Sequence, residues 1–142
     1  MGKTYGFFNE VLGSRMSELI HIDHADGLTR SYSAATNWGG LVFPCGQVPY
    51  QEDGSVPVGI KLQTIQCLEN LSAALAHANS SIHNLLQVTV FLSDQKDFDE
   101  YDSAWREFFG TSKLPPRTTV FVSGFRGEKR IEISSIATKK GN

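Results

Sequence analysis

Residues 85–109, LLQVTVFLSDQKDFDEYDSAWREFF, change from a strand pattern to a helix pattern within one short stretch. The first part, residues 85–92, is rich in β-branched residues and alternates in polarity, which predicts a β-strand. The second part predicts an amphipathic helix, with Asp94 or Asp97 as its N-cap. Its apolar stripe is aromatic and is expected to pack in a core, and it comprises Phe98, Tyr101, Trp105 and Phe108.

A longer helix is predicted on the N-terminal side, over residues 58–78, because apolar residues recur there at steps of three and four. This stripe needs a sheet to pack against and comprises Leu62, Ile65, Leu68, Leu71, Leu75 and Ala78. Before it, residues 30–38 and 41–46 flank the Gly39-Gly40 turn and predict a β-hairpin. Pro44 has no N–H to donate, so we expect the second strand to be irregular, or to lie at an edge, at that point.

Two further strands are predicted at the C-terminal end of the chain. Pro115-Pro116 ends any helix and leads the chain, extended, into residues 117–124, RTTVFVSG. The loop at residues 125–129 then turns it back into residues 130–138, RIEISSIAT. The predicted order is β-β-α-β-α-β-β, without repeats or linkers, which is typical of one α+β domain.

The last of these strands predicts that the sheet has two unlike faces. Ile131 and Ile133 point one way, whereas Glu132, Ser134 and Ile136 point the other way. Two helices can cover only one face of the sheet, so a carboxylate and a hydroxyl are expected on the uncovered face. A subunit interface that encloses a wet pocket would explain this pattern.

Composition excludes several classes of protein. The chain has 142 residues, of which 40% are hydrophobic and 20% charged, which is normal for a globular domain and unlike a disordered chain. A net charge of −2 lacks the basic excess of a dedicated nucleic-acid-binding module. There is no apolar run long enough to span a membrane, no signal-peptide core and no disulfide framework. We therefore expect a soluble, cytoplasmic protein with no membrane partner.

Residues 1–28 show no convincing period, and the sequence predicts a domain over residues 29–142 preceded by an extension or a leader. Met16 could itself be the native start, and the sequence does not decide between these interpretations. His21 and His24 are three residues apart and lack further ligands, which is too little to predict a metal site.

Charge is distributed unevenly along the chain. From Asp94 to Glu107 there are six acids and two bases, a net of −4, whereas from Lys113 to the C-terminus there are seven bases and two acids, a net of +5. An acidic solvated helix beside basic strands is one interpretation. The other is a positive site, built from the C-terminal strands, for a small anion.

Five stretches of the chain form a recognisable pattern: Gly46-Gln47-Val48-Pro49, the helix from Gln66 to Asn70-Leu71, residues 88–109, Pro116-Arg117-Thr118-Thr119-Val120 and Ile131-Glu132-Ile133. Together they resemble the RidA/YjgF family of small enamine/imine deaminases. The resemblance runs without a break from Ser31 to Thr138, and its most specific part is the stretch that begins at Pro116.

This resemblance implies a chorismate-mutase-like α+β fold, with one mixed sheet and two helices on one face. It also implies a homotrimer with three clefts between subunits. Members of the family hydrolyse 2-aminoacrylate and related imines or enamines to a 2-keto acid and ammonia, without a metal or an organic cofactor. The expected partner is therefore a small 2-imino or 2-keto acid, and no nucleic acid.

The resemblance also implies roles for individual residues. Arg117 matches the arginine that binds the substrate carboxylate, a task suited to the parallel N–H groups of a guanidinium. Glu132 matches the glutamate that holds or activates water, and Ser134 could help to place it. The backbone N–H of Thr119 matches a donor to the carboxylate, so its side chain is expected to matter little. Tyr32 matches a tyrosine of the N-terminal strand that lines the cleft.

The chain departs from the family pattern at three places. Arg30-Ser31 replaces the usual Gly-Pro before Tyr32. Cys45 stands where serine is common, which weakens a small polar contact to substrate, and no histidine is placed by sequence to activate it as a nucleophile. Asp102 stands where many members have asparagine, and its charge is unfavourable beside a carboxylate site unless it faces Lys or Arg. Both Cys45 and Asp102 indicate a substrate other than, or broader than, 2-aminoacrylate.

Other functions remain open at this point. The same clefts could hold a small carboxylate for sensing or regulation without catalysis. Ribonuclease activity, an older label of the family, is disfavoured by the net charge of −2, although the basic residues between Lys113 and Lys140 could bind RNA weakly.

Overall fold

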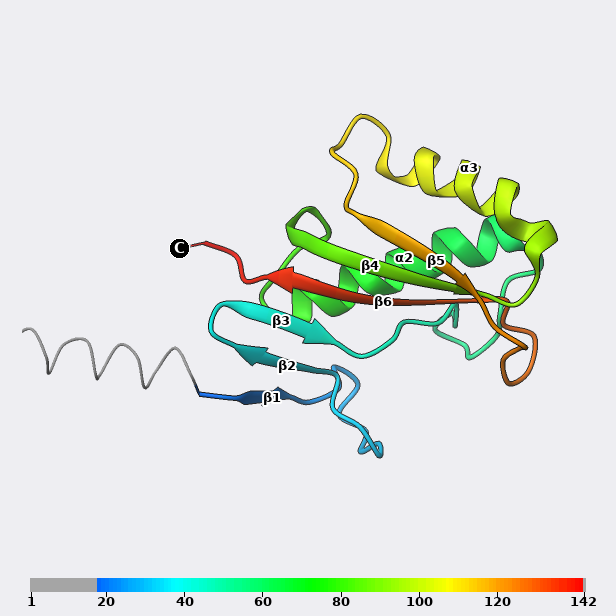
Figure 1. Ribbon diagram of the computed structural model, residues 1–142. Coiled ribbons are helices and arrows are strands. Elements are labelled where there is room, and N and C mark those ends of the chain that lie inside the picture. Colours follow the sequence, from blue (N-terminus) through cyan, green and yellow to red (C-terminus); the bar gives the residue numbers. More distant parts are fainter. Residues whose placement is uncertain (1–17, 142) are drawn as a thin grey trace, which may run out of the picture.

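The computed structural model describes residues 18–141, which form a mixed sheet of six strands and two α-helices (Figure 1). The predicted α+β class is therefore confirmed. The elements are β1 (Ile20–Ile22), β2 (Ala35–Trp38), β3 (Leu41–Pro44), α2 (Ile60–His77), β4 (Leu85–Leu92), α3 (Phe98–Phe109), β5 (Arg117–Phe121) and β6 (Ile131–Thr138). In the described part of the chain, no helix has the length and apolar character needed to cross a membrane.

The strands lie in the order β1-β2-β3-β6-β4-β5. The strand β4 pairs antiparallel with β6 and parallel with β5, and α3 provides the crossover that a parallel pair requires. The strand β3 pairs with β6 only at Leu41 and Val42. That ladder ends before Pro44, which has no N–H to donate, so the irregularity expected at this proline is confirmed.

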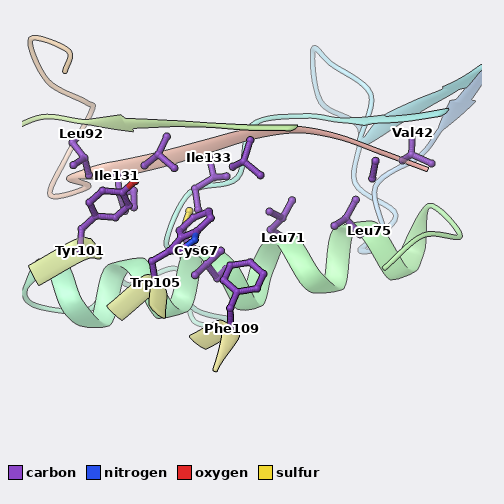
Figure 2. Close-up of a cluster of buried hydrophobic side chains, with 14 of the residues drawn as sticks. Val42, Cys67, Leu71, Leu75, Leu92, Tyr101, Trp105, Phe109, Ile131 and Ile133 are labelled. Carbon is purple, nitrogen blue, oxygen red and sulfur yellow. The ribbon is translucent and has the colours of Figure 1, made fainter. Parts of the chain in front are cut away.

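Both helices cover the same face of the sheet, and the hydrophobic core lies between the sheet and the helices (Figure 2). In β6, Ile131 and Ile133 are buried on this helix face. The alternate residues Glu132, Ser134 and Ile136 are half-buried on the other face, which we call the open face. The two unlike faces predicted from the last strand are therefore present.

The helix α2 packs on the sheet through a stripe that differs at its start from the predicted one. Leu68, Leu71 and Leu75 are buried as expected, whereas Leu62 is 54% exposed. The buried stripe begins instead at Ile60, and a residue two positions further along points roughly the opposite way around a helix. The helix ends where Asn79 adopts a left-handed conformation with φ of 61°.

The helix α3 contributes the aromatic part of the core. Tyr101, Trp105 and Phe109 are buried, and neighbouring rings in this series lie 6.2 and 5.1 Å apart. Such tilted and edge-to-face contacts are favourable geometries for aromatic pairs. The predicted core packing is confirmed for Tyr101 and Trp105, whereas Phe98 and Phe108 are only partly buried. Phe109, which was not part of the predicted stripe, is the buried residue at the end of the helix.

The sequence did not predict β1, which lies within residues 1–28. It has three residues, and it pairs antiparallel with Ala35–Asn37 of β2 at one edge of the sheet. Three residues are too few to show an alternating pattern, so only the pairing reveals the strand. The interpretation of residues 1–15 and of Met16 lies outside the described residues.

Candidate functional site

Arg117 is the first residue of β5, the strand at the edge of the sheet opposite β1. Its guanidinium carbon lies 4.9 Å from the ring centroid of Tyr101 and 5.1 Å from that of Trp105. These cation–π contacts with two aromatic rings restrict where the guanidinium can lie. The side chain remains 20% exposed, so its orientation is restricted while a ligand can still reach it.

Asp102 lies directly against Arg117. Its Oδ1 accepts a hydrogen bond from Nη2 of Arg117 at 2.8 Å, and its Oδ2 lies 3.3 Å from Nε of Arg106. The hydrogen bond from Arg117 lowers the pKa of the Asp102 carboxyl, and Arg106 adds to this effect. The sequence predicted that an aspartate at position 102 needs a neighbouring Lys or Arg. Two arginines, Arg106 and Arg117, are in fact its neighbours.

Thr119 contributes to this region through both its backbone and its side chain. Pro116 accepts a hydrogen bond from the N–H of Val88, and Val122 donates one to Leu92, so β5 bonds to β4 through its even-numbered residues. The N–H of Thr119 is consequently directed outward at the edge of the sheet. Its hydroxyl lies 2.6 Å from the hydroxyl of Tyr101, so the side chain ties β5 to α3, a role that the sequence analysis missed.

Glu132 lies on the open face of the sheet, in β6. Gly46 approaches it so closely that a Cβ added at Gly46 would stand 2.5 Å from Oε2 of Glu132. The contact explains why a glycine is needed at this position: any side chain would occupy the place of the carboxylate. In the sequence, Gly46 stands out only as part of the motif Gly46-Gln47-Val48-Pro49, which does not predict this contact.

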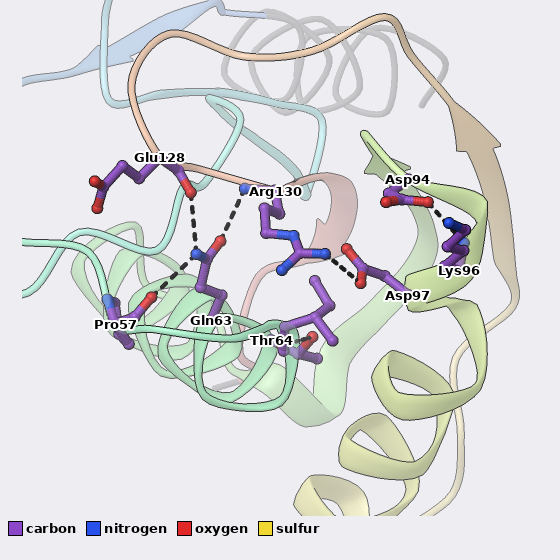
Figure 3. A network of polar contacts seen from close by, with 9 residues as sticks. Pro57, Gln63, Thr64, Asp94, Lys96, Asp97, Glu128 and Arg130 are labelled. Atoms are coloured by element: carbon purple, nitrogen blue, oxygen red, sulfur yellow. Dashed lines mark hydrogen bonds and ion pairs between the residues drawn. The ribbon is translucent and has the colours of Figure 1, made fainter.

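A polar network holds the beginning of β6, two residues before Glu132 (Figure 3). The backbone N–H of Arg130 donates to Oε1 of Gln63, a buried residue of α2, at 2.8 Å. The guanidinium of Arg130 donates to Asp97, which precedes α3, at 2.6 Å. The network thus ties β6 to both helices and restricts the position of Glu132 along the sheet.

Cys45 follows β3 directly and is half-buried. Its sulfur accepts a long hydrogen bond from Nε2 of Gln47 at 3.5 Å. Burial raises the pKa of the Cys45 thiol, and the charge of Glu132 acts in the same direction. A raised pKa reduces the thiolate population at neutral pH, which disfavours Cys45 as a nucleophile.

Tyr32 lies in a bend before β2, so the prediction that it belongs to a strand is wrong. The extended pairing of β2 begins only at Ala35. The tyrosine is 56% exposed, and its ring packs edge-on against His24 at 5.2 Å. It shares a cavity of about 780 Å³ with Cys45 and Gly46.

The predicted site residues form two groups, which lie on opposite faces of the sheet within one chain. Paired residues on neighbouring strands point to the same face. Arg117 pairs with the buried Val88 and so points to the helix face, whereas Glu132 pairs with Phe91 on the open face. Their strands are separated by β4, about 10 Å across the sheet. We call Arg117, Asp102 and Thr119 the arginine half-site, and Glu132, Gly46, Cys45 and Tyr32 the glutamate half-site.

Metal ligation is not supported by the side chains of residues 18–141. Within this range there is no group of three or more His, Cys, Asp or Glu residues that could hold a metal ion. His21 instead contacts the hydroxyl of Ser33 through Nδ1 at 3.0 Å.

Comparison with known proteins identifies relatives along most of the chain. A sequence model of the family described as endoribonuclease L-PSP matches residues 24–139. A RutC family protein of Pyrococcus horikoshii is 39% identical over 127 residues, which cover 88% of this chain and 100% of that protein. The Escherichia coli protein TdcF, named as a candidate reactive intermediate deaminase, is 28% identical over 127 residues, which cover 87% and 98%.

Solved structures agree with the fold. The crystal structure of yeast Mmf1 matches with a TM-score of 0.77 at 33% identity, and the match covers 87% of this chain and 100% of that chain. The crystal structure of Escherichia coli TdcF with bound serine matches with a TM-score of 0.73 at 28% identity, covering 80% and 91%.

Proposed function

The chain belongs to the endoribonuclease L-PSP family, also called the YjgF/RidA family, and from this premise we propose that it hydrolyses reactive 2-imino and 2-enamine acids. The substrates are compounds such as 2-aminoacrylate, and the products are a 2-keto acid and ammonia. The name of TdcF supports this reaction class, and its structure with bound serine supports a small amino-acid-like ligand.

The placement of Arg117 is the observation that carries this proposal. A guanidinium held against two aromatic rings at a sheet edge, with its forked N–H groups, suits a planar carboxylate. Asp102 uses one of the five N–H groups that a guanidinium carries, which leaves donors for a ligand. The outward N–H of Thr119, two residues along the same strand, supplies a further donor.

Glu132 supplies the acid–base chemistry. Water adds to the carbon of the C=N bond, and the carbinolamine that forms loses ammonia to leave a C=O bond. A single carboxylate can accept a proton from the attacking water and return one to the departing nitrogen. Tyr32 lines a cavity together with Gly46, the neighbour of Glu132, and from there donates a hydrogen bond to water or substrate. Water and side chains supply all that this hydrolysis requires, so the reaction needs no metal or organic cofactor.

The separation of the two half-sites supports a shared active site between chains. Arg117 and Glu132 lie on opposite faces of one sheet, so a ligand that touches both must lie between two copies. The open face carries apolar side chains around Glu132, among them Phe43, Phe91, Val120 and Ile136, which suits an interface. A homotrimer in which each arginine half-site meets the glutamate half-site of the next chain satisfies this requirement three times.

Mixing two inactive variants tests the reaction and the shared site together. Arg117→Ala removes one half-site and Glu132→Gln the other, and each variant alone should release keto acid from 2-aminoacrylate at no more than about a tenth of the wild-type rate. After joint refolding in equal amounts, about a quarter of the sites in a cyclic trimer carry both residues, so about a quarter of the wild-type rate should return. Light scattering checks that the mixed particles are trimers.

Three other outcomes would contradict parts of the proposal. Mixed trimers without any recovery would show that the two residues do not share a site across chains. Full activity of either parent variant would remove that residue from the site. Saturable binding of 2-oxobutanoate by the wild type, with no turnover on a panel of imines, would support the alternative function, a non-catalytic carboxylate-binding or regulatory trimer.

The family description names an endoribonuclease, and we favour the deaminase over that activity. Binding to RNA depends on neutralising several phosphates, whereas the chain has a net charge of −2. Cleavage of RNA that persists through further purification and disappears in Arg117→Ala would instead support the ribonuclease.

Gly46→Ala should reduce turnover while leaving the fold intact. The new methyl group would meet Oε2 of Glu132, the mobile end of a side chain, so the carboxylate rotates away and the backbone is spared. We expect kcat to fall by roughly tenfold to a hundredfold and the melting temperature to change little. Gly141→Ala is the matched control, because nothing lies within 4 Å of a Cβ built there. Unchanged kcat in Gly46→Ala would remove Glu132 from the reaction.

A further inference from the structure

Two opposite charges stand side by side in the arginine half-site. Nη2 of Arg117 and Oδ1 of Asp102 are 2.8 Å apart, and the two side chains are 20% and 25% exposed. The other carboxylate oxygen of Asp102 faces Nε of Arg106, whose side chain is 74% exposed. The half-site therefore offers a ligand an acceptor as well as donors.

This arrangement is unfavourable for a ligand that carries only a negative charge. A bound carboxylate would have to share the guanidinium of Arg117 with the carboxylate of Asp102, and the two like charges would repel each other in a partly desolvated place. The cost falls on any simple anion, including the 2-keto acid that hydrolysis produces.

The same arrangement is favourable for a ligand with both charges. In a protonated 2-imino acid, the carboxylate carbon and the positively charged nitrogen are both bonded to the same carbon, C2. The carboxylate can take the remaining N–H groups of Arg117 while the positive nitrogen donates to Asp102. Charge-assisted hydrogen bonds at both ends give a complementary fit.

We propose that Asp102 makes the site specific for zwitterionic ligands, namely 2-iminium acids and 2-amino acids, over the corresponding 2-keto acids. This inference rests on the proposed function. The reaction is R–C(=NH₂⁺)–COO⁻ + H₂O → R–CO–COO⁻ + NH₄⁺, in which water forms the new C–O bonds and nitrogen leaves with the electrons of the C–N bonds. Asp102 stays ionised throughout and favours the protonated imine, the form that water attacks most readily.

The proposal also accounts for release of the product. Hydrolysis removes the positive nitrogen that Asp102 binds, so the remaining 2-keto acid meets an uncompensated carboxylate. The substrate is consequently bound more tightly than the product, although both have the same carboxylate for Arg117.

The test compares two stable probes of matched size, L-2-aminobutanoate as the zwitterion and 2-oxobutanoate as the anion. Their Kd values are measured by calorimetry for the wild type, Asp102→Asn and Asp99→Asn. The last is the matched control, since Asp99 is an exposed acid of the same helix and removal of its charge leaves the Asp102–Arg117 pair untouched.

In Asp102→Asn, we expect the Kd of L-2-aminobutanoate to rise, and that of 2-oxobutanoate to fall, each by roughly three- to tenfold. Asp99→Asn should change neither. A change of both Kd values in the same direction and by the same factor, or no change, would overturn the zwitterion preference. Arg117→Ala separates the two hypotheses: if it leaves both Kd values unaltered, the proposed carboxylate site itself is wrong.

Discussion

Arg117→Ala should lower kcat/KM for 2-aminoacrylate by roughly tenfold to a hundredfold, because the loss of a charge-assisted hydrogen bond to the carboxylate costs about 1.5–3 kcal/mol. Arg117→Lys should fall between the wild type and alanine: it keeps the charge but loses the forked donors and the fit over the Tyr101 and Trp105 rings. The measurement is the rate of keto-acid release from 2-aminoacrylate that a dehydratase generates in the same cuvette.

The effect of Arg117→Ala on the fold should be small. The side chain is 20% exposed, and Asp102 keeps a second ion pair with Arg106 when Arg117 is removed, so we expect a modest fall in the melting temperature and no loss of the trimer. Arg126→Ala is the control, since Arg126 is an exposed arginine in the loop between β5 and β6. Equal loss of activity in both variants would mean that general positive charge, and not this particular guanidinium, is what the substrate requires.

Glu132→Gln should lower kcat by about a hundredfold or more, because the amide cannot accept a proton from water. The size and shape of the side chain are retained beside Gly46, so the Kd of 2-oxobutanoate should change little. Single-turnover kinetics with 2-aminoacrylate, together with calorimetry on the keto acid, separates the two effects.

Glu128→Gln provides the control for Glu132→Gln. Glu128 lies in the loop before β6, and the residue is exposed. Its backbone carbonyl accepts a hydrogen bond from Gln63, and this bond does not depend on the Glu128 side chain. Its substitution should leave kcat unaltered. A Glu132→Gln variant with normal kcat and a raised KM would assign Glu132 to binding and would remove it from proton transfer.

Local patterns were sufficient to predict most of the elements. The alternation of residues 85–92, the aromatic stripe of α3 and the two faces of β6 each arise from neighbours in sequence, and all are present. The predictions failed where an element was too short to show a pattern, or where packing against the sheet decided which face of a helix is buried. The strand β1 has only three residues, and Leu62 satisfied a helical spacing without lying on the face that the sheet covers.

The site residues divide in the same way. The sequence, through its resemblance, singled out Arg117, Glu132 and Asp102 and could say that Asp102 required a basic neighbour. It could not say which neighbour. That Asp102 bonds to Arg117 depends on α3 packing beside β5, and the pair is 15 residues apart in sequence.

The sequence by itself determined the order of the main strands and helices, the alternation within each strand and the chemical types available for a site. Those properties depend on residues two to four positions apart, so they can be read from the sequence without knowledge of the fold. The tertiary structure alone decided that Arg117 and Glu132 lie on opposite faces, that Gly46 leaves room for the Glu132 carboxylate, and that Asp102 shares the guanidinium. Each of these depends on strand register and on which face the helices cover, and both are settled by burial of apolar surface across the whole fold.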